Sequence, residues 1–172
     1  MALRQIREEQ DPVLRKISKE VKEITPRIRQ LVEDMAETMY HANGVGLAAP
    51  QVGILKRVIV VDIGMEEKDP HIFINPVIYD QEGNERGVEG CLSVPGVTGW
   101  IDRPGKLKLK ALDLDGQEVT LEAEDYFARA ICHEVDHLDG VLFIDRADFE
   151  PDDDEDDDEG YEDEDDELPE EK

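Results

Sequence analysis

Apolar residues recur at helical spacing in two stretches of the chain. In the first, the apolar side chains fall three or four residues apart: Ile28, Leu31, Val32, Met35 and Met39. Thr25 and Pro26 stand before them as an N-cap and a first-turn residue, and Asn43 and Gly44 follow. The pattern predicts an amphipathic helix that begins at Thr25 and Pro26 and ends at Asn43 and Gly44.

The second helical pattern lies near the end of the chain. Its apolar members would form one wide buried face: Tyr126, Phe127, Ala130, Ile131, Val135 and Leu138. We expect it to begin near Glu124 and Asp125, because acidic groups favour the positive end of a helix dipole. It should end at Asp139 and Gly140, because glycine adopts the left-handed conformation of a C-cap. A helix of about fifteen residues is a rigid support for functional groups.

Between these helices the spacing changes to that of strands. Residues 58–63 form an apolar run that only Asp62 interrupts, and residues 72–79 form a second one. Asn75 and Pro76 interrupt the second run, which predicts an edge strand because proline cannot donate to a ladder.

A hairpin follows these runs. Residues 106–114 alternate apolar and polar but shift phase at Leu112, which predicts a bulge. Asp115 and Gly116 mark a turn, and residues 119–123 alternate on the way back. We therefore expect an α+β fold, with short antiparallel strands packed around a central helix and one further helix near the N-terminus.

Charge divides the chain into two parts. The formal net charge is −26, yet residues 152–172 alone carry 16 acidic side chains and one lysine, with little apolar surface. Like charges repel, and such a segment buries too little to offset its ordering entropy. We expect a disordered acidic tail at residues 149–172 after a catalytic domain at residues 1–148. The body is also acidic, which argues against direct nucleic-acid binding.

Cysteine usage and hydropathy point to a cell compartment. The chain has two cysteines, no signal peptide and no apolar run long enough for a membrane span. We expect a cytoplasmic protein without a membrane partner.

The predicted second helix carries candidate chemistry in the sequence HEVDH at residues 133–137. His133 and His137 are four residues apart, so both imidazoles share one helix face and can reach one metal ion. Glu134 stands beside them, where it could move a proton of a metal-bound water. From this motif alone, two solvated histidines on a helix surface remain the alternative.

A metal site of this kind needs a third protein ligand and an open position. His41 and His71 are isolated, and we expect both at the surface. Cys91 stands in the glycine- and proline-rich sequence EGCLSVPG at residues 89–96, from which a thiolate could turn toward the helix. The alternative for Cys91 is a small buried apolar side chain.

A third segment, NGVGLAAPQ at residues 43–51, consists mostly of small residues. Such residues allow the backbone to approach a ligand closely. The segment ends in Gln51, whose amide could donate to an oxyanion. Taken alone, a helix C-cap followed by a tight connection explains it better.

Together, the three segments resemble one family, the peptide deformylases. The matching motifs are GVGLAAPQ at residues 44–51, EGCLS at 89–93 and HEVDHLDG at 133–140, in the family's order. DPVLR at residues 11–15 also resembles the family's start, and the resemblance covers roughly residues 4–147. It implies a hydrolase of protein biosynthesis that removes the formyl group from N-terminal formyl-methionine and releases formate.

The resemblance also assigns roles in catalysis. Cys91, His133 and His137 would bind the metal, and Glu134 would act as general base and then general acid. The Gln51 side chain and the Leu92 backbone N–H would stabilise the tetrahedral oxyanion.

Further residues would hold the substrate or support the site. Gly46 and Gly90 would bind the peptide through the backbone as an added strand. Val45, Tyr126 and Arg129 would border the pocket for the methionine side chain. The resemblance also implies a supporting ion pair between Glu89 and Arg103.

Metal identity is open on ligand chemistry alone. One thiolate and two imidazoles suit Zn²⁺, Fe²⁺, Co²⁺ or Ni²⁺, and the resemblance favours Fe²⁺. The chain departs from the family pattern at Cys132, where glutamine is usual. Adjacent helical residues point about 100° apart, so we expect Cys132 to be a core thiol and not a further ligand.

The implied partner is a nascent formylated polypeptide, with transient ribosome association. Two other functions compete with this interpretation. A zincin-type metallopeptidase would take its third ligand from beyond the helix, but no histidine follows Gly140. A non-enzymatic protein that captures cations or basic partners would explain the acidic tail, but not the metal motif with its glutamate.

Overall fold

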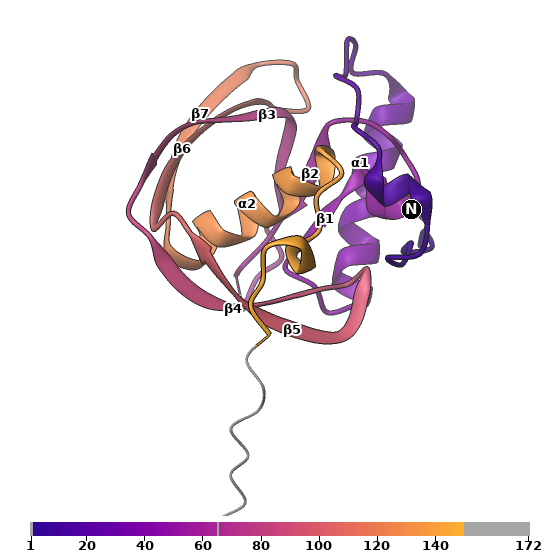
Figure 1. Ribbon diagram of the computed structural model, residues 1–172. Helices are drawn as coiled ribbons and strands as arrows, with labels where there is room; N and C mark the ends of the chain where they lie inside the picture. The colour runs from indigo at the N-terminus through magenta and orange to yellow at the C-terminus, as the bar shows by residue number, and fades with distance from the viewer. Residues whose placement is uncertain (1, 65, 150–172) are drawn as a thin grey trace, which may run out of the picture.

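The described part of the chain forms two antiparallel sheets arranged around a helix. Figure 1 shows the computed structural model, which describes residues 2–64 and 66–149. The elements follow one another as η1 (Pro12–Arg15), α1 (Pro26–His41), β1 (Gly46–Ala48), η2 (Ala49–Val52), β2 (Val58–Val61), β3 (His71–Glu82), β4 (Glu85–Cys91), β5 (Val94–Arg103), β6 (Lys106–Leu112), β7 (Glu118–Glu124), α2 (Asp125–Leu138) and η3 (Phe143–Asp145).

The expected α+β architecture with antiparallel strands is confirmed. One sheet has the strand order β1-β2-β3-β6-β7, and β4 pairs with β5 in a second sheet. In Figure 1, α2 runs through the middle of the molecule and the strands curve around it. The predicted tail lies outside the described residues, apart from Phe149.

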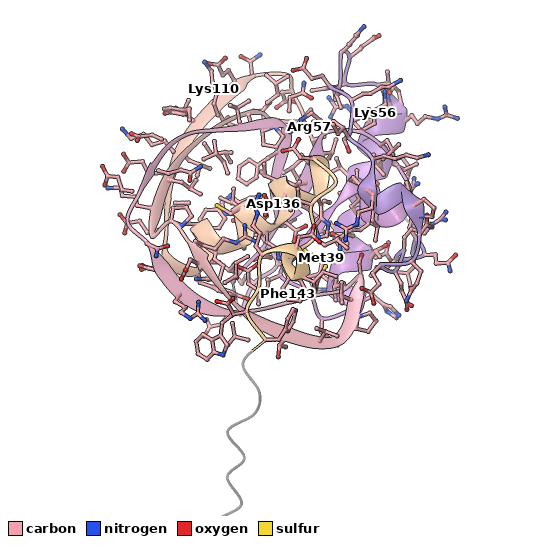
Figure 2. All side chains as sticks on the ribbon, in the orientation of Figure 1. Met39, Lys56, Arg57, Lys110, Asp136 and Phe143 are labelled. Atoms are coloured by element: carbon pink, nitrogen blue, oxygen red, sulfur yellow. The ribbon has the colours of Figure 1, made fainter. Side chains whose placement is uncertain are left out.

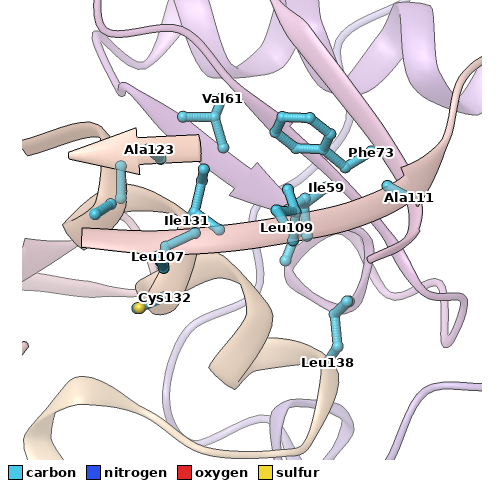
Figure 3. Close-up of a cluster of buried hydrophobic side chains, with 13 residues drawn as sticks. Ile59, Val61, Phe73, Leu107, Leu109, Ala111, Ala123, Ile131, Cys132 and Leu138 are labelled. Carbon is cyan, nitrogen blue, oxygen red and sulfur yellow. The ribbon is translucent and has the colours of Figure 1, made fainter. Parts of the chain in front are cut away.

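Strand β2 is apolar throughout because both of its faces are covered. Ile59 and Val61 belong to the core cluster that contains the apolar face of α2. Figure 3 shows this cluster, in which Ile131 of α2 lies near Leu107 and Leu109 of β6. Val58, on the opposite face of β2, packs in the cluster formed with α1.

Helix α1 begins and ends where the sequence predicts. The Thr25 hydroxyl accepts a hydrogen bond from the Ile28 backbone N–H at 3.3 Å, and Pro26 occupies the first turn. The apolar positions that define the predicted face are all buried. After the helix, Asn43 adopts a positive φ of 57°, which turns the chain toward β1.

Helix α2 also matches its prediction. It spans Asp125–Leu138, and Gly140 follows with a φ of 74°. A Cβ at Gly140 would lie 2.6 Å from the backbone oxygen of Arg15, so the chain passes too close there for any other residue. The last turn of α2, which carries His137, is thereby packed against the N-terminal segment.

The prediction of an edge strand at residues 72–79 is wrong. β3 is a central strand between β2 and β6. Pro76 is tolerated because the register with β6 shifts between Ile74 and Val77, so the proline lies at a bulge. Asn75 there has a φ of 53°, and its side-chain amide exchanges two 2.8 Å hydrogen bonds with the backbone of Val21.

The bulge predicted at the phase shift near Leu112 is also wrong. β6 pairs with β7 in a regular register, and the irregularities toward β6 lie in β3. The apolar phase shifts for another reason. Leu109 and Ala111 face the α2 cluster, whereas Leu112 and Leu114 pack against the α1 cluster.

Candidate metal centre and active site

The three candidate ligands come together from two elements. Cys91 ends β4, and His133 and His137 lie one turn apart on α2. One ligand atom from each of the three lies within 4.8 Å of the other two. The Cys91 Sγ is 3.4 Å from the His137 Nε2. The structure thus brings together residues that are 46 positions apart in the chain.

The chemistry of this group fits a divalent metal ion. His137 is 1 % exposed, and its Nδ1 has no hydrogen-bond partner among the described residues. Burial, followed by the charge of His133, lowers the pKa of His137 and favours the neutral imidazole that binds metals. Two imidazoles and one thiolate match the preferences of zinc, iron, cobalt and nickel.

A buried carboxylate fixes the orientation of the first histidine. The His133 Nδ1 lies 2.8 Å from Glu89 Oε1, which directs its other ring nitrogen toward the ligand group. The expected ion pair is present, because Arg103 donates from Nε and Nη2 to Glu89, at 2.9 Å each. Burial alone would raise the pKa of Glu89, but the hydrogen bonds from Arg103 and His133 outweigh it and hold the pKa at about 2.

Arg129 and Asp136 complete this hydrogen-bond network. The sequence analysis did not assign either of them a place in it. Arg129 lines the cavity as expected, but its Nη1 donates to Glu89 Oε2 at 2.8 Å. Its Nη2 donates to the backbone oxygen of Glu85 at 2.7 Å. Asp136, labelled near the middle of the molecule in Figure 2, accepts from Arg103 Nη1 at 2.7 Å. Its position within the HEVDH motif was the available signal.

Glu134 lies against the backbone of β1. The side chain is 5 % exposed, and its Oε2 has no hydrogen-bond partner among the described residues. Burial raises the pKa of Glu134 to about 7. A Cβ at Gly46 would lie 2.5 Å from Glu134 Oε1, so only glycine leaves room for this carboxylate. This contact gives a physical reason for glycine at position 46.

Gln51 is held beside the ligand group by hydrogen bonds at both ends of its amide. Its Oε1 accepts from the Ala48 backbone N–H at 2.9 Å. Its Nε2 donates to the Ser93 hydroxyl at 3.0 Å and lies 3.6 Å from the Cys91 Sγ. The sequence interpretation gave Ser93 no role, although it belongs to the EGCLS motif.

A cavity of about 490 Å³ opens beside these groups. Apart from the metal ligands and the Glu89 network, the predicted site residues that line it are Val45, Gly46, Gln51, Gly90, Leu92, Tyr126 and Glu134. Val45 is 37 % exposed and Tyr126 is 52 % exposed, so both stand at its mouth. The cavity therefore joins an apolar, accessible mouth to a buried polar interior.

The remaining histidines and the second cysteine lie apart from this site. His41 and His71 are exposed, as expected. Cys132 is 7 % exposed in the α2 core cluster, and burial raises the pKa of its thiol to about 11. Its prediction as a core thiol is confirmed.

Comparisons with known proteins agree on one family. The family model described as polypeptide deformylase matches residues 3–152. A peptide deformylase of Acetivibrio thermocellus is 54 % identical over 147 residues, which is 86 % of this chain and 85 % of that protein. One of Clostridium botulinum is 56 % identical, over 86 % of this chain and 98 % of that protein.

Solved structures give the same result. The crystal structure of peptide deformylase from Thermotoga maritima superposes with a TM-score of 0.83 at 44 % identity, covering 87 % of this chain and all of that one. That of Legionella pneumophila gives a TM-score of 0.83 at 41 % identity, with 86 % and 87 % covered.

Proposed function

This chain belongs to the peptide deformylase family, metal-dependent hydrolases that remove the N-terminal formyl group of nascent polypeptides, and we propose how its residues divide that work. Cys91, His133 and His137 bind one divalent metal ion. Glu134 carries the proton, and Gln51 and the Leu92 backbone N–H bind the oxyanion. The observation that carries the proposal is the convergence of one sulfur and two nitrogens within 4.8 Å, beside a buried carboxylate.

The protein side of the reaction begins with a proton at Glu134. A divalent ion bound by the three ligands would acidify water and polarise the formyl carbonyl. Glu134 accepts the proton of the attacking water as its oxygen bonds to the formyl carbon. The amide donors of Gln51 and Leu92 stabilise the negative charge on the former carbonyl oxygen. Glu134 then protonates the leaving nitrogen as the C–N bond breaks, which yields formate and a free amino terminus.

Substrate would enter through the apolar mouth. The backbone at Gly46 and Gly90 flanks the cavity from β1 and β4, where an extended peptide can pair as an added strand. Val45 and Tyr126 offer apolar surface to the methionine side chain. Arg129 contributes indirectly, since its guanidinium is bonded to Glu89 and to backbone oxygens.

Iron is our proposal for the metal in the cell, and it gives a testable vulnerability. Thiolates oxidise readily, and a ferrous ion beside one is redox-active. We expect the Fe²⁺ enzyme to lose activity in air faster than the same protein loaded with Ni²⁺ or Zn²⁺. Half-lives in air would be measured for the three forms; equal half-lives would contradict an iron enzyme with this weakness.

We place the enzyme in the cytoplasm, with the nascent chain as its partner and transient contact with the ribosome. No helix in residues 2–64 and 66–149 is long and apolar enough to cross a membrane. The catalytic domain would comprise residues 1–148.

The test is formate release from a formyl-methionyl tripeptide, run beside an internally quenched peptide with a blocked N-terminus. We expect stoichiometric formate from the first and no cleavage of the second. Cleavage of internal bonds without formate release would point to an endopeptidase instead. Binding without turnover of either would leave only a capture function.

A further inference from the structure

A buried serine joins the two proposed oxyanion donors. Ser93 directly follows Leu92 in the turn between β4 and β5, and its hydroxyl accepts a hydrogen bond from Gln51 Nε2 at 3.0 Å. Ser93 is 0 % exposed, and the described residues that line the cavity do not include it, whereas Gln51 does line the cavity. The Ser93 hydroxyl can therefore influence a bound substrate only through another group, and Gln51 is the group that it contacts.

The Gln51 amide is held at two points, and together they fix its plane. Its Oε1 accepts from the Ala48 backbone N–H at 2.9 Å. A flipped amide would place two donors against each other at that point, so the Ala48 bond decides which end of the amide is the donor end. With this bond alone the amide could still rotate about Oε1. The bond to Ser93 supplies the second point, at Nε2.

The second N–H of Gln51 is the one that remains for chemistry. A primary amide nitrogen carries two hydrogens, and Ser93 accepts one of them. The Nε2 atom lies 3.6 Å from the Sγ of Cys91, one of the proposed metal ligands. With the first N–H fixed on Ser93, the planar amide directs the second toward the ligand group, where the oxyanion of the proposed reaction would form.

The N-terminal segment holds the backbones of the same two residues. The Arg7 N–H donates to the Gln51 carbonyl oxygen at 2.7 Å, and the Glu9 N–H donates to the Ser93 carbonyl oxygen at 2.9 Å. One short stretch of chain thus bonds to both backbones. Because these bonds do not involve the Ser93 hydroxyl, its removal should free the Gln51 amide and leave both backbones in place.

We propose that Ser93 is a positioning residue for deformylation, whose hydroxyl aims the second N–H of Gln51 at the oxyanion. This inference rests on the proposed function, in which Gln51 stabilises that charge. A fixed donor acts on the charge that develops in the transition state, so its loss of aim should lower kcat. Binding of the ground-state peptide depends on other parts of the cavity, so KM should change little.

The experiment measures kcat and KM of Ser93→Ala for formate release from amidated formyl-Met-Ala-Ser, beside metal content. We expect kcat to fall about 10- to 100-fold, somewhat less than the 10²- to 10³-fold cost of losing an oxyanion donor outright. KM should stay within about threefold and the metal should stay stoichiometric. A fall in kcat that matches a loss of metal would overturn the positioning role.

The matched control is Ser18→Ala. Ser18 is 4 % exposed, and its Oγ has no hydrogen-bond partner among the described residues. The control removes a buried serine hydroxyl that does not contact Gln51, so kcat should stay within about twofold of wild type. An equal fall in kcat for both serine variants would show a general cost of losing a buried hydroxyl and would overturn the proposal.

A double-mutant cycle tests whether Ser93 acts through Gln51. Residues that act as one unit give effects that do not add. Gln51→Ala combined with Ser93→Ala should therefore have the same kcat as Gln51→Ala alone, within about twofold. If Ser93→Ala lowers kcat by the same factor with and without Gln51, the hydroxyl acts by another route and the proposal is wrong.

A second pair of variants separates the hydroxyl from packing. Ser93→Thr and Ser93→Val give side chains of nearly one shape, of which only threonine keeps the acceptor. We expect kcat of the threonine variant to exceed that of the valine variant about tenfold or more. This pair also decides the matter if Ser93→Ala does not fold, and equal kcat for the two would overturn the proposal.

The outcomes for the two proposals differ. If Gln51→Ala lowers kcat and Ser93→Ala does not, the positioning role is wrong and the proposed function stands. If Gln51→Ala leaves kcat unchanged, the oxyanion role of Gln51 fails and the positioning role fails with it. If the wild-type protein releases no formate, the proposed function as a whole fails, together with the role of Ser93.

Discussion

At the scale of single residues, the contact with Glu134 restricts position 46 to glycine. A Cβ at position 46 would lie 2.5 Å from Glu134 Oε1 and 2.9 Å from its Cγ. The Glu134 side chain is buried, at 5 % exposed, so its carboxylate has little room to move away. A methyl group at position 46 must therefore displace the proton carrier or the backbone of β1.

We predict that Gly46→Ala lowers kcat by roughly 100-fold, because a displacement near 1 Å at a reacting group can cost that much. Metal content should stay stoichiometric, since the three atoms nearest to the new methyl group all belong to Glu134 and none to a metal ligand. The measurement is kcat for formate release beside metal analysis. A variant with kcat within threefold of wild type would show that Glu134 does not need its present position.

The sequence predicted which residues gather at the site but not their hydrogen bonds. A helical i, i+4 pair is a local pattern, so His133 and His137 follow from spacing alone. The bond from Gln51 to Ser93 joins positions 42 apart and depends on how η2 meets the turn between β4 and β5. No local pattern contains that contact, and Ser93 therefore received no role.

At the scale of elements, Glu89 ties α2 to the β4–β5 hairpin. It accepts from Arg103 of β5 and from Arg129 of α2, and it holds the ring of His133. We predict that Glu89→Gln weakens metal binding by about 10–100-fold, the usual effect of losing a partner of a ligating histidine. Metal affinity would be measured by competition with a chromogenic chelator.

The control for Glu89→Gln is Asp102→Asn on the same hairpin. The Asp102 side chain is 51 % exposed and only 3.9 Å from Arg86, so its loss should leave the affinity unchanged. Equal affinities for both variants and wild type would mean that Glu89 is only a structural ion pair.

The loop after β2 makes a contribution to the free energy of unfolding that depends on pH. Burial opposes ionisation of Asp62, but its carboxylate accepts from the Tyr40 hydroxyl and the backbone N–H groups of Gly64 and Asp69. These bonds outweigh burial and hold the pKa of Asp62 below its usual 3.8. A lowered folded-state pKa contributes stability that is present above about pH 4 and is lost as pH falls through the folded-state value.

We therefore predict that Asp62→Asn lowers the free energy of unfolding by about 1–3 kcal/mol at pH 7, because a buried charge-assisted network is broken. The difference in Tm from wild type should be constant from pH 5 to 8 and should shrink as the pH falls below about 4. Asp69→Asn, at an exposed position, is the control. A difference in Tm that persists undiminished at the lowest pH would contradict the ionised network.

Element prediction succeeded for the helices and failed for β3. The helices carry caps and periodicity within their own residues, such as Thr25 and Gly140. Pro76 suggested an edge strand, because proline has no backbone N–H to donate to a neighbouring strand. Sequence alone does not show that the register shift beside Pro76 makes this donor unnecessary. Asn75 makes the bulge possible through the backbone of Val21, 54 positions away.

At the scale of the whole molecule, acidic residues 152–172 follow a domain that holds the proposed site. The folded domain contains every proposed catalytic group, and the acidic segment contains none of them. We predict that a chain ending at Glu150 matches the full chain in kcat/KM on a short neutral formyl-peptide within about threefold. A tenfold loss with unchanged metal content would mean that the segment takes part in the site itself.

The domain could be assigned from sequence because three motifs, each weak alone, occur in one order. What the sequence could not supply is the placement of the end of the described chain against β5. That placement depends on Asp148 meeting Trp100, a long-range antiparallel bridge without a local signature.

The central claim is that Glu134 carries the proton in a site built by Cys91, His133 and His137. It is tested most directly by kcat for formate release from Glu134→Gln, with Glu124→Gln at the start of the same helix as control. Glutamine keeps the shape but cannot carry the proton, so kcat should fall about 10²- to 10⁴-fold with full metal content. The control should stay within twofold. A Glu134→Gln enzyme that retains more than a tenth of wild-type kcat would contradict the account.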